Sequence, residues 1–169
     1  MLNGPQVELP AMLAAREKRA ARQQAFRERY HSPLLSFCLN IPGPVKTTPK
    51  LRTLFDLTCH EIQACLTDLC IAISDSQTIH EATGDEYLLA FAGDAPTVKA
   101  AMTQLEESRP LGRLFDIDIL TAEGQKLSRL VPRRCLLCDR QAQDCARSRR
   151  HSVRELTDRI ETLLQEYMH

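Results

Sequence analysis

The segment 115–120 reads Phe-Asp-Ile-Asp-Ile-Leu, so apolar and acidic residues alternate over its first five positions. Period two is the repeat of a β-strand, whose successive side chains point to opposite faces. The predicted strand therefore carries Phe115, Ile117 and Ile119 on one face and Asp116 and Asp118 on the other. This pattern describes an ordinary half-solvated strand, and it also describes a site that uses two neighbouring carboxylates.

The chemical interpretation starts from the repulsion between Asp116 and Asp118, since neither has a cation beside it in the sequence. A Mg²⁺ ion would relieve it, because Mg²⁺ favours oxygen ligands and is commonly held by one or two carboxylates together with substrate phosphates. Gly112 and Arg113, just before the strand, offer a close backbone approach and a guanidinium suited to phosphate. We therefore expect a metal-assisted phosphoryl or nucleotidyl transfer site.

Composition indicates one compact globular domain. The chain has 169 residues, of which 43% are hydrophobic and 26% charged, with a formal net charge of zero. No run of about eighteen apolar residues occurs, so we expect no membrane span. The apolar cluster 11–15 is too short for a signal peptide, and a cytoplasmic location is the expectation.

Helical and strand-like patterns alternate along the chain. The patterns predict helices over 10–29, 48–69, 94–108 and from 153 onward, and strands over 34–41, 71–73, 86–92 and 115–120, with turn chemistry at 74–76 and 83–85. The expected fold class is α+β: a ferredoxin-like βαββαβ sheet core with N-terminal and C-terminal helices. We expect residues 1–131 to form this core, and a Cys-rich segment with a C-terminal helix, 132–169, to pack on the same domain.

The first predicted helix is rich in cations. It has a thin apolar stripe, and its basic residues outnumber its two acids, Glu17 and Glu28; they are Arg16, Lys18, Arg19, Arg22, Arg27 and Arg29. Such a run is commonly a solvated face. The alternative is a docking surface for an acidic partner.

Further residues complete the candidate transfer site. Glu86, which opens a neighbouring strand, is the candidate third carboxylate for Mg²⁺. The cations available to phosphates are Arg113, Lys46, Arg133 and Arg134. Aspartyl phosphatase chemistry is disfavoured, since Leu120 stands where such enzymes usually carry Thr or Val. Lys46 follows Pro-Gly-Pro, which is equally consistent with a plain turn.

The seven cysteines divide into two groups. Cys38, Cys59, Cys65 and Cys70 lie in apolar-patterned segments, and we expect them to be small buried hydrophobes. The other three, with one histidine, have spacing compatible with a structural Cys₃His zinc site: Cys135, Cys138, Cys145 and His151. The alternative is a set of reduced thiols that packs the C-terminal segment.

Two long motifs, Pro-Leu-Gly-Arg-Leu-Phe-Asp-Ile-Asp-Ile-Leu-Thr at 110–121 and Pro-Arg-Arg-Cys-Leu-Leu-Cys at 132–138, carry a family resemblance. Cys145-Ala146-Arg147 and His151 extend it, as do the upstream segments 20–23, 33–37 and 42–46. The sequence resembles the citrate lyase holo-acyl-carrier protein synthase family, also called the apo-citrate lyase phosphoribosyl-dephospho-CoA transferase family. The resemblance covers nearly the whole chain and is weakest over 74–85.

This resemblance implies a reaction. The family transfers the phosphoribosyl-dephospho-CoA unit of triphosphoribosyl-dephospho-CoA to a serine of the citrate lyase acyl carrier subunit and releases pyrophosphate. A related carrier, such as that of malonate decarboxylase, is an alternative acceptor. The runner-up function is a non-catalytic, zinc-containing protein-interaction module. Nucleic-acid binding is disfavoured, because 5% aromatic residues and no Trp leave few stacking platforms.

Overall fold

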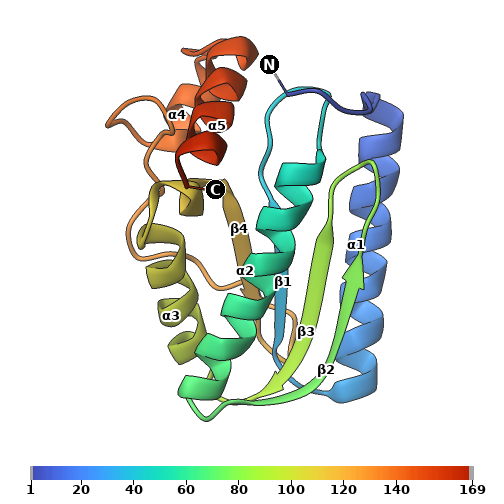
Figure 1. Ribbon diagram of the computed structural model, residues 1–169. Helices are drawn as coiled ribbons and strands as arrows, with labels where there is room; N and C mark the ends of the chain where they lie inside the picture. The colour runs from blue at the N-terminus through green and yellow to red at the C-terminus, as the bar shows by residue number, and fades with distance from the viewer. Residues whose placement is uncertain (1, 168–169) are drawn as a thin grey trace.

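The computed structural model describes residues 2–167, which form one antiparallel sheet with helices on both faces (Figure 1). The helices are α1 (Leu9–Tyr30), α2 (Pro49–Asp68), α3 (Ala95–Glu107), α4 (Ala142–Arg147), α5 (Val153–Tyr167) and a short 3₁₀ helix, η1 (Pro110–Leu114). The strands are β1 (Leu34–Leu39), β2 (Ala72–Ile79), β3 (Glu86–Ala92) and β4 (Phe115–Leu120). The predicted α+β class is confirmed.

Local capping explains where three helices begin. The Thr48 hydroxyl accepts a hydrogen bond from the Leu51 N–H at 3.2 Å and caps α2. The Asp94 carboxylate accepts from the Thr97 N–H at 2.9 Å and caps α3. Ser152 and Glu155 bond reciprocally before α5 and form a capping box.

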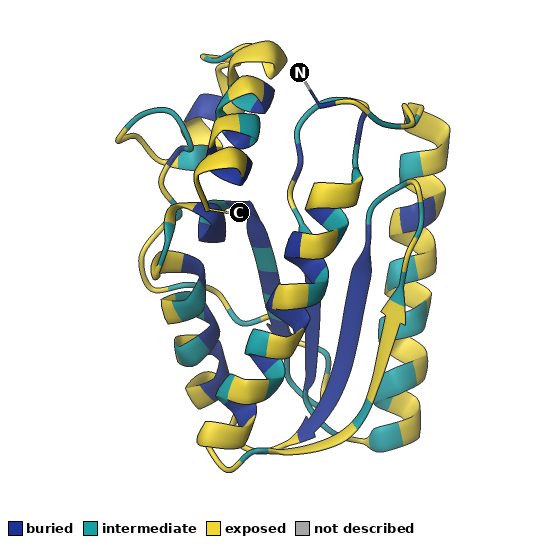
Figure 2. Cartoon of the chain, in the orientation of Figure 1, coloured by how far each residue is buried: buried dark blue, intermediate teal, exposed yellow. Residues whose placement is uncertain are grey.

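The strand order is β2-β3-β1-β4, and every neighbouring pair is antiparallel. Alternate residues of the strands face α2 and α3 and form the main core, in which the Phe37 and Phe55 rings stack with their centroids 5.0 Å apart. Figure 2 shows this core as the dark face of β3 and β4, whereas β2 is exposed at one edge. β4 forms the other edge of the sheet.

The opposite face of the sheet is covered in part by α1. Its Phe26 and Tyr30 pack against a small apolar cluster of Leu34, Leu88 and Ala90. Next to this cluster the same face turns polar. Ser36 and Asp118 lie in register with Leu88, and the next row across β3, β1 and β4 is Glu86, Cys38 and Asp116. The carboxylates of β4 therefore lie on the face opposite the main core.

Two local predictions are wrong. β2 continues to Ile79 through the expected turn at 74–76, because pairing with β3 resumes after an irregularity between Ile73 and Asp75. Cys70 is exposed, in a left-handed conformation with φ 56° just after α2. Residues 110–114, just before the predicted strand, form η1. Tyr167, at the end of α5, is 52% exposed.

After β4 the chain turns and runs back beside it. The Leu127 N–H donates to the Ile119 carbonyl at 2.9 Å, and Leu120 and Lys126 form an isolated bridge. Residues 126 and 127 therefore pair with the last strand. No helix in the described residues is long and apolar enough to span a membrane.

Candidate active site

β4 presents its two carboxylates together on one face. Phe115, Ile117 and Ile119 are at most 1% exposed in the main core, while Asp116 and Asp118 alternate with them and are partly exposed. The side chain of Asp116 is 41% exposed and that of Asp118 is 25% exposed. The predicted separation of the two faces is confirmed, and both carboxylates are open to a ligand.

Asp116 and Asp118 line a cavity of about 630 Å³ beside β4, which we call the β4 cavity. Its walls come from β4, the returning segment 126–133 and α4. Four cations and two carboxylates contribute to the lining, namely Lys99, Lys126, Arg129, Arg133, Asp116 and Asp118. The excess of positive charge suits a ligand that carries several negative charges.

Each carboxylate already lies near a cation. Lys126 Nζ is 2.6 Å from Asp118 Oδ2, and an Arg133 Nη2 is 3.7 Å from Asp116 Oδ1. Each carboxylate, which has no cation beside it in the sequence, thus acquires one through the fold. The sequence hid these pairs because the turn after β4 brings the cations back alongside the strand.

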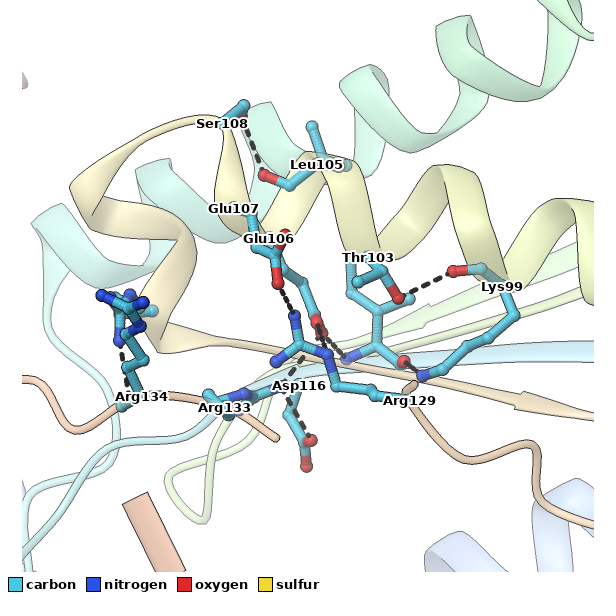
Figure 3. A network of polar contacts seen from close by, with 12 residues as sticks. Lys99, Thr103, Leu105, Glu106, Glu107, Ser108, Asp116, Arg129, Arg133 and Arg134 are labelled. Carbon is cyan, nitrogen blue, oxygen red and sulfur yellow. Dashed lines mark hydrogen bonds and ion pairs between the residues drawn. The ribbon is translucent and has the colours of Figure 1, made fainter. Parts of the chain in front are cut away.

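Two side chains of α3 hold the backbone between the carboxylates. Glu106 Oε1 accepts a hydrogen bond from the Ile117 N–H at 3.0 Å, and Lys99 Nζ donates to the Ile117 carbonyl at 2.9 Å. Ile117 lies on the edge strand, so no further strand pairs with its outward N–H and carbonyl. The two α3 side chains satisfy these backbone groups instead. Figure 3 shows Lys99 and Glu106 reaching from α3 toward β4, with Asp116 nearby. We call this pair the α3 clamp.

The α3 clamp belongs to a larger charged network. Glu106 is 2% exposed and accepts from Arg133 Nη2 at 3.0 Å, while Arg129 Nε lies 3.5 Å from its second oxygen (Figure 3). Burial raises the pKa of Glu106, although the nearby Arg133 and Arg129 oppose the rise. Burial lowers the pKa of Lys99, with Glu106 opposing. Arg133 thus bridges a buried carboxylate and Asp116.

Sequence analysis missed Lys99, Glu106 and Arg129. Lys99 and Glu106 are seven residues apart, which is about two turns of an α-helix. They therefore lie on the same side of α3. A signal was present, because these polar residues directly neighbour the buried Val98 and the partly buried Leu105. Polar residues beside an apolar stripe are nevertheless usually solvated, so their partner could not be identified without the fold.

Arg113 and Gly112 have structural contacts outside the β4 cavity. Arg113 Nη1 donates to the carbonyls of Arg134 at 2.6 Å and Cys135 at 3.2 Å. A Cβ on Gly112 would lie 2.2 Å from the Glu106 carbonyl oxygen, so the close approach that requires glycine is to α3. With Arg133 and Arg134, both also line an adjoining pocket of about 310 Å³.

The structure places Lys46 and Glu86 away from the cavity lining. Lys46 Nζ donates to the Ile41 carbonyl at 2.6 Å, and burial lowers the pKa of this amine. Glu86 is 7% exposed and accepts from Arg19 at 3.0 Å and Arg22 at 2.9 Å. Glu86 shares the face of Asp116 but lies two strands away, with Cys38 between them in register.

The structure brings together Cys135, Cys138, Cys145 and His151, whose ligand atoms all lie within 4.8 Å of one another. Cys138 Sγ is 3.5 Å from Cys145 Sγ and 3.4 Å from His151 Nε2. A tetrahedral metal with bonds of about 2.3 Å to sulfur separates its sulfur ligands by roughly 3.8 Å. Among the described residues, these four side chains are the group of His, Cys, Asp or Glu ligands close enough together to hold one metal ion.

Comparison with known protein families matches residues 7–167 to apo-citrate lyase phosphoribosyl-dephospho-CoA transferase. The proteins of that name from Escherichia coli O1:K1 and Shigella flexneri serotype 5b are 41% and 40% identical to the chain over 164 residues. Each match covers 95% of this chain and 90% of the relative. The chain belongs to this family.

Membership in the apo-citrate lyase phosphoribosyl-dephospho-CoA transferase family confirms the resemblance drawn from the two motifs. The match spans β4, the α3 clamp and the Cys₃His cluster, since all lie between residues 7 and 167. The names of the relatives describe a transferase of a phosphoribosyl-dephospho-CoA group.

Proposed function

We propose that the chain transfers the phosphoribosyl-dephospho-CoA unit of triphosphoribosyl-dephospho-CoA to a serine of the citrate lyase acyl carrier protein. The serine oxygen forms a bond to the phosphorus next to the ribose, the bond from that phosphorus to the pyrophosphate breaks, and the hydroxyl proton is released. Family membership over 95% of the chain is the observation that carries this proposal. The cationic β4 cavity, with its two carboxylates, supports it.

The four cations of the β4 cavity are proposed to bind the donor's phosphates. Lys126 and Arg133 now lie beside Asp118 and Asp116 and can exchange these carboxylates for phosphate oxygens when the donor enters. Arg129 lies deeper, with its guanidinium against Glu106 and Glu107. This arrangement neutralises the charge of the pyrophosphate as it leaves.

Asp116 and Asp118 fit the donor set of Mg²⁺, because they offer carboxylate oxygens from one strand face to a cavity with room for phosphates. A bound Mg²⁺ would neutralise the triphosphate and assist departure of pyrophosphate. Glu86 stays a prediction as third ligand, and it would have to leave Arg19 and Arg22 to act as one. The Mg²⁺ role itself is part of the proposal.

Four other residues stay predictions as substrate contacts. Arg134 is exposed beside the cavity wall, and Gly112 and Arg113 line the adjoining pocket. Lys46 lies near Arg16, and its amine is bound to the Ile41 carbonyl. Of the predicted phosphate-binding cations, Arg133 is the one that lines the β4 cavity.

We also propose that the Cys₃His cluster binds Zn²⁺. Three cysteines and one histidine are a usual ligand set for structural zinc, and four protein ligands leave no open position for catalysis. The spacing of the thiols supports this assignment over packed reduced thiols.

The sheet supports a ferredoxin-like description of the core. Its strand order, β2-β3-β1-β4, combines two βαβ halves with α2 and α3 on one face. The ferredoxin-like assignment of the fold is our proposal.

The acceptor carrier is proposed to dock near the mouth of the β4 cavity, because its serine must reach the donor there. The alternative docking surface is α1, but Arg19 and Arg22 of this helix bind Glu86 and Glu81. The cations Arg16, Lys18 and Arg29 of α1 are exposed and stay candidates for an acidic partner.

The experiment incubates the protein with apo carrier subunit, Mg²⁺ and the triphosphate donor, and weighs the carrier by mass spectrometry. We expect the carrier to gain one phosphoribosyl-dephospho-CoA unit. Asp116→Asn and Asp118→Asn should each lower the rate by about a hundredfold or more, as expected for loss of charge that binds at a reacting centre. Asp68→Asn, at an exposed position at the end of α2, is the matched control and should keep the full rate.

A carrier of unchanged mass would contradict the transfer and favour the interaction-module alternative. Normal rates in well-folded Asp116→Asn and Asp118→Asn proteins would refute the proposed role of the two carboxylates. The same assay with the malonate decarboxylase carrier distinguishes the two acceptors.

A further inference from the structure

We propose that metal binding at Cys135, Cys138, Cys145 and His151 positions Arg133 and α4 as one wall of the β4 cavity, and so supports binding of a polyphosphate ligand there. This inference rests on the proposed function and extends it, since it assigns the zinc a role in donor binding.

The metal ligands and the cavity wall belong to one short hairpin. The Ala142 N–H donates to the Arg133 carbonyl at 2.8 Å, and the Cys135 N–H donates to the Arg140 carbonyl at 2.7 Å. Arg134 and Gln141 form a bridge between the same two arms. The metal ligand Cys135 thus lies two residues from Arg133. A metal bound to Cys135 would therefore fix the arm of the hairpin that carries Arg133.

α4 connects the hairpin to the other side of the same wall. It has only six residues, which is too short for a stable helix in isolation. Its Cys145 points into the cluster, whereas Ala142, Gln143 and Ala146 line the β4 cavity. A metal bound to Cys145 therefore holds three cavity-lining residues in place.

The segment 132–150 has no apolar core of its own. Within it, Cys135 and Cys145 are the buried residues, and both belong to the cluster. Small units that bury little apolar area need a disulfide or a metal to remain ordered. The free thiols of this cluster lie near one another, so a metal is the available cross-link.

Arg133 connects the hairpin to the carboxylates. Its Nη2 lies 3.0 Å from Glu106 Oε1 and 3.7 Å from Asp116 Oδ1. Arg113 ties the hairpin to η1, just before β4, through the carbonyls of Arg134 and Cys135. When the hairpin is disordered, Arg133 loses the fixed main chain that directs it, and its charge is then less available at the cavity.

The first test measures zinc and anion binding together. Purified protein should contain about one zinc per chain by elemental mass spectrometry, and it should bind inorganic triphosphate by calorimetry. Cys145→Ser should lose the zinc and weaken triphosphate binding about tenfold or more, as for loss of a charge-assisted contact. The control Cys70→Ser changes an exposed thiol outside the cluster and should alter neither property.

A second measurement keeps the inference testable if Cys145→Ser folds poorly. The unmodified protein is stripped with a chelator, checked for an intact sheet by far-ultraviolet circular dichroism, and then reloaded with Zn²⁺. We expect stripping to weaken triphosphate binding and to expose 132–150 to protease, and reloading to restore both. Arg133→Lys should retain zinc while it weakens triphosphate binding.

Three results would overturn the inference: purified protein that neither contains nor takes up zinc, zinc-free protein that binds triphosphate as tightly as the loaded form, or a hairpin equally resistant to protease in both. These readouts do not require turnover. Failure of carrier modification with normal zinc-coupled triphosphate binding would therefore refute the proposed function alone, and full transfer by zinc-free protein would refute this inference alone.

Discussion

Ile117 shows how one residue can depend on distant side chains. Its side chain is 1% exposed in the core, while its N–H and carbonyl bond to Glu106 and Lys99 of α3. Because Asp116 and Asp118 flank it, whatever fixes the backbone of Ile117 also fixes the direction of both carboxylates. The residues that orient the proposed site thus include Glu106, which does not touch the donor in our proposal.

Replacing Glu106 tests this role. Glu106→Ala should lower the free energy of unfolding by about 2–3 kcal/mol, because it leaves the buried Ile117 N–H without an acceptor. Glu106→Gln should cost less, since its amide oxygen can still accept this hydrogen bond. The control Glu107→Ala changes a neighbour whose side chain is 57% exposed and should cost under about 1 kcal/mol. Urea denaturation measures the free energy of unfolding of the three variants. Equal decreases for Glu106→Ala and Glu107→Ala would contradict the role of the α3 clamp.

The pH dependence of stability follows from the same carboxyl. Burial raises the pKa of Glu106 in the folded protein above its ordinary value of about 4.5. The folded state then holds the Glu106 proton more tightly than the unfolded state does. The stabilisation that this proton gives the folded protein is complete below a pH of about 4.5, and it is lost as the pH rises through the raised pKa. The stability of wild type relative to Glu106→Gln should therefore fall over that window. A difference that rises or stays flat with pH would refute this.

At the scale of elements, α1 is held to the sheet by charge as well as by packing. Its apolar contacts involve Phe26 and Tyr30, whereas Arg19 and Arg22 bind the two oxygens of Glu86 on β3. Glu86 is buried, so its two partners compensate a charge that would otherwise be costly. The helix predicted as a basic surface therefore uses part of its charge within the molecule.

Glu86→Gln distinguishes an anchor from a metal ligand. If Glu86 anchors α1, Glu86→Gln should lower the free energy of unfolding by about 1–3 kcal/mol, because it weakens two charge-assisted hydrogen bonds. We expect the dependence of the transfer rate on Mg²⁺ concentration to remain that of the wild type. A large increase in the Mg²⁺ requirement without loss of stability would instead support the predicted third ligand. Glu28→Gln, an exposed position on α1, is the control.

At the scale of the whole molecule, α5 completes the main core from the C-terminal end. Ile160, Leu163 and Leu164 are at most 2% exposed and join the cluster that contains β1, β3 and β4. Figure 1 shows α5 beside α4 and near η1, at one end of the sheet. The last helix therefore connects the Cys-rich segment to the core that carries the carboxylates.

Cooperative unfolding tests the predicted packing of 132–169 on the core 1–131. We expect zinc-loaded protein to unfold in one transition, with the same midpoint by circular dichroism and by tyrosine fluorescence. Leu163→Ala should lower the free energy of unfolding by about 2–5 kcal/mol and shift both probes together. Leu130→Ala, at a fully exposed position, should change it by less than about 0.5 kcal/mol. Two separate transitions would show that the segment folds independently.

The order of helices and strands, the shared face of Asp116 and Asp118, and the Cys₃His set followed from the sequence. Period and capping are local properties, so β4, α2, α3 and the start of α5 were predictable from neighbouring residues. Family membership was also accessible, because two contiguous motifs carried the resemblance.

Tertiary structure alone decided what surrounds the carboxylates. Lys126 and Arg133 return to them through a turn, and Gly112 contacts α3 rather than a ligand. Lys99 and Glu106 of α3 bind the backbone of Ile117, which lies between the two carboxylates. These contacts join residues that are not neighbours in the sequence, and no periodicity encodes which of many solvated charges acquires a partner. Folding makes that choice, because only some charges come within a few ångströms of a buried group that needs them.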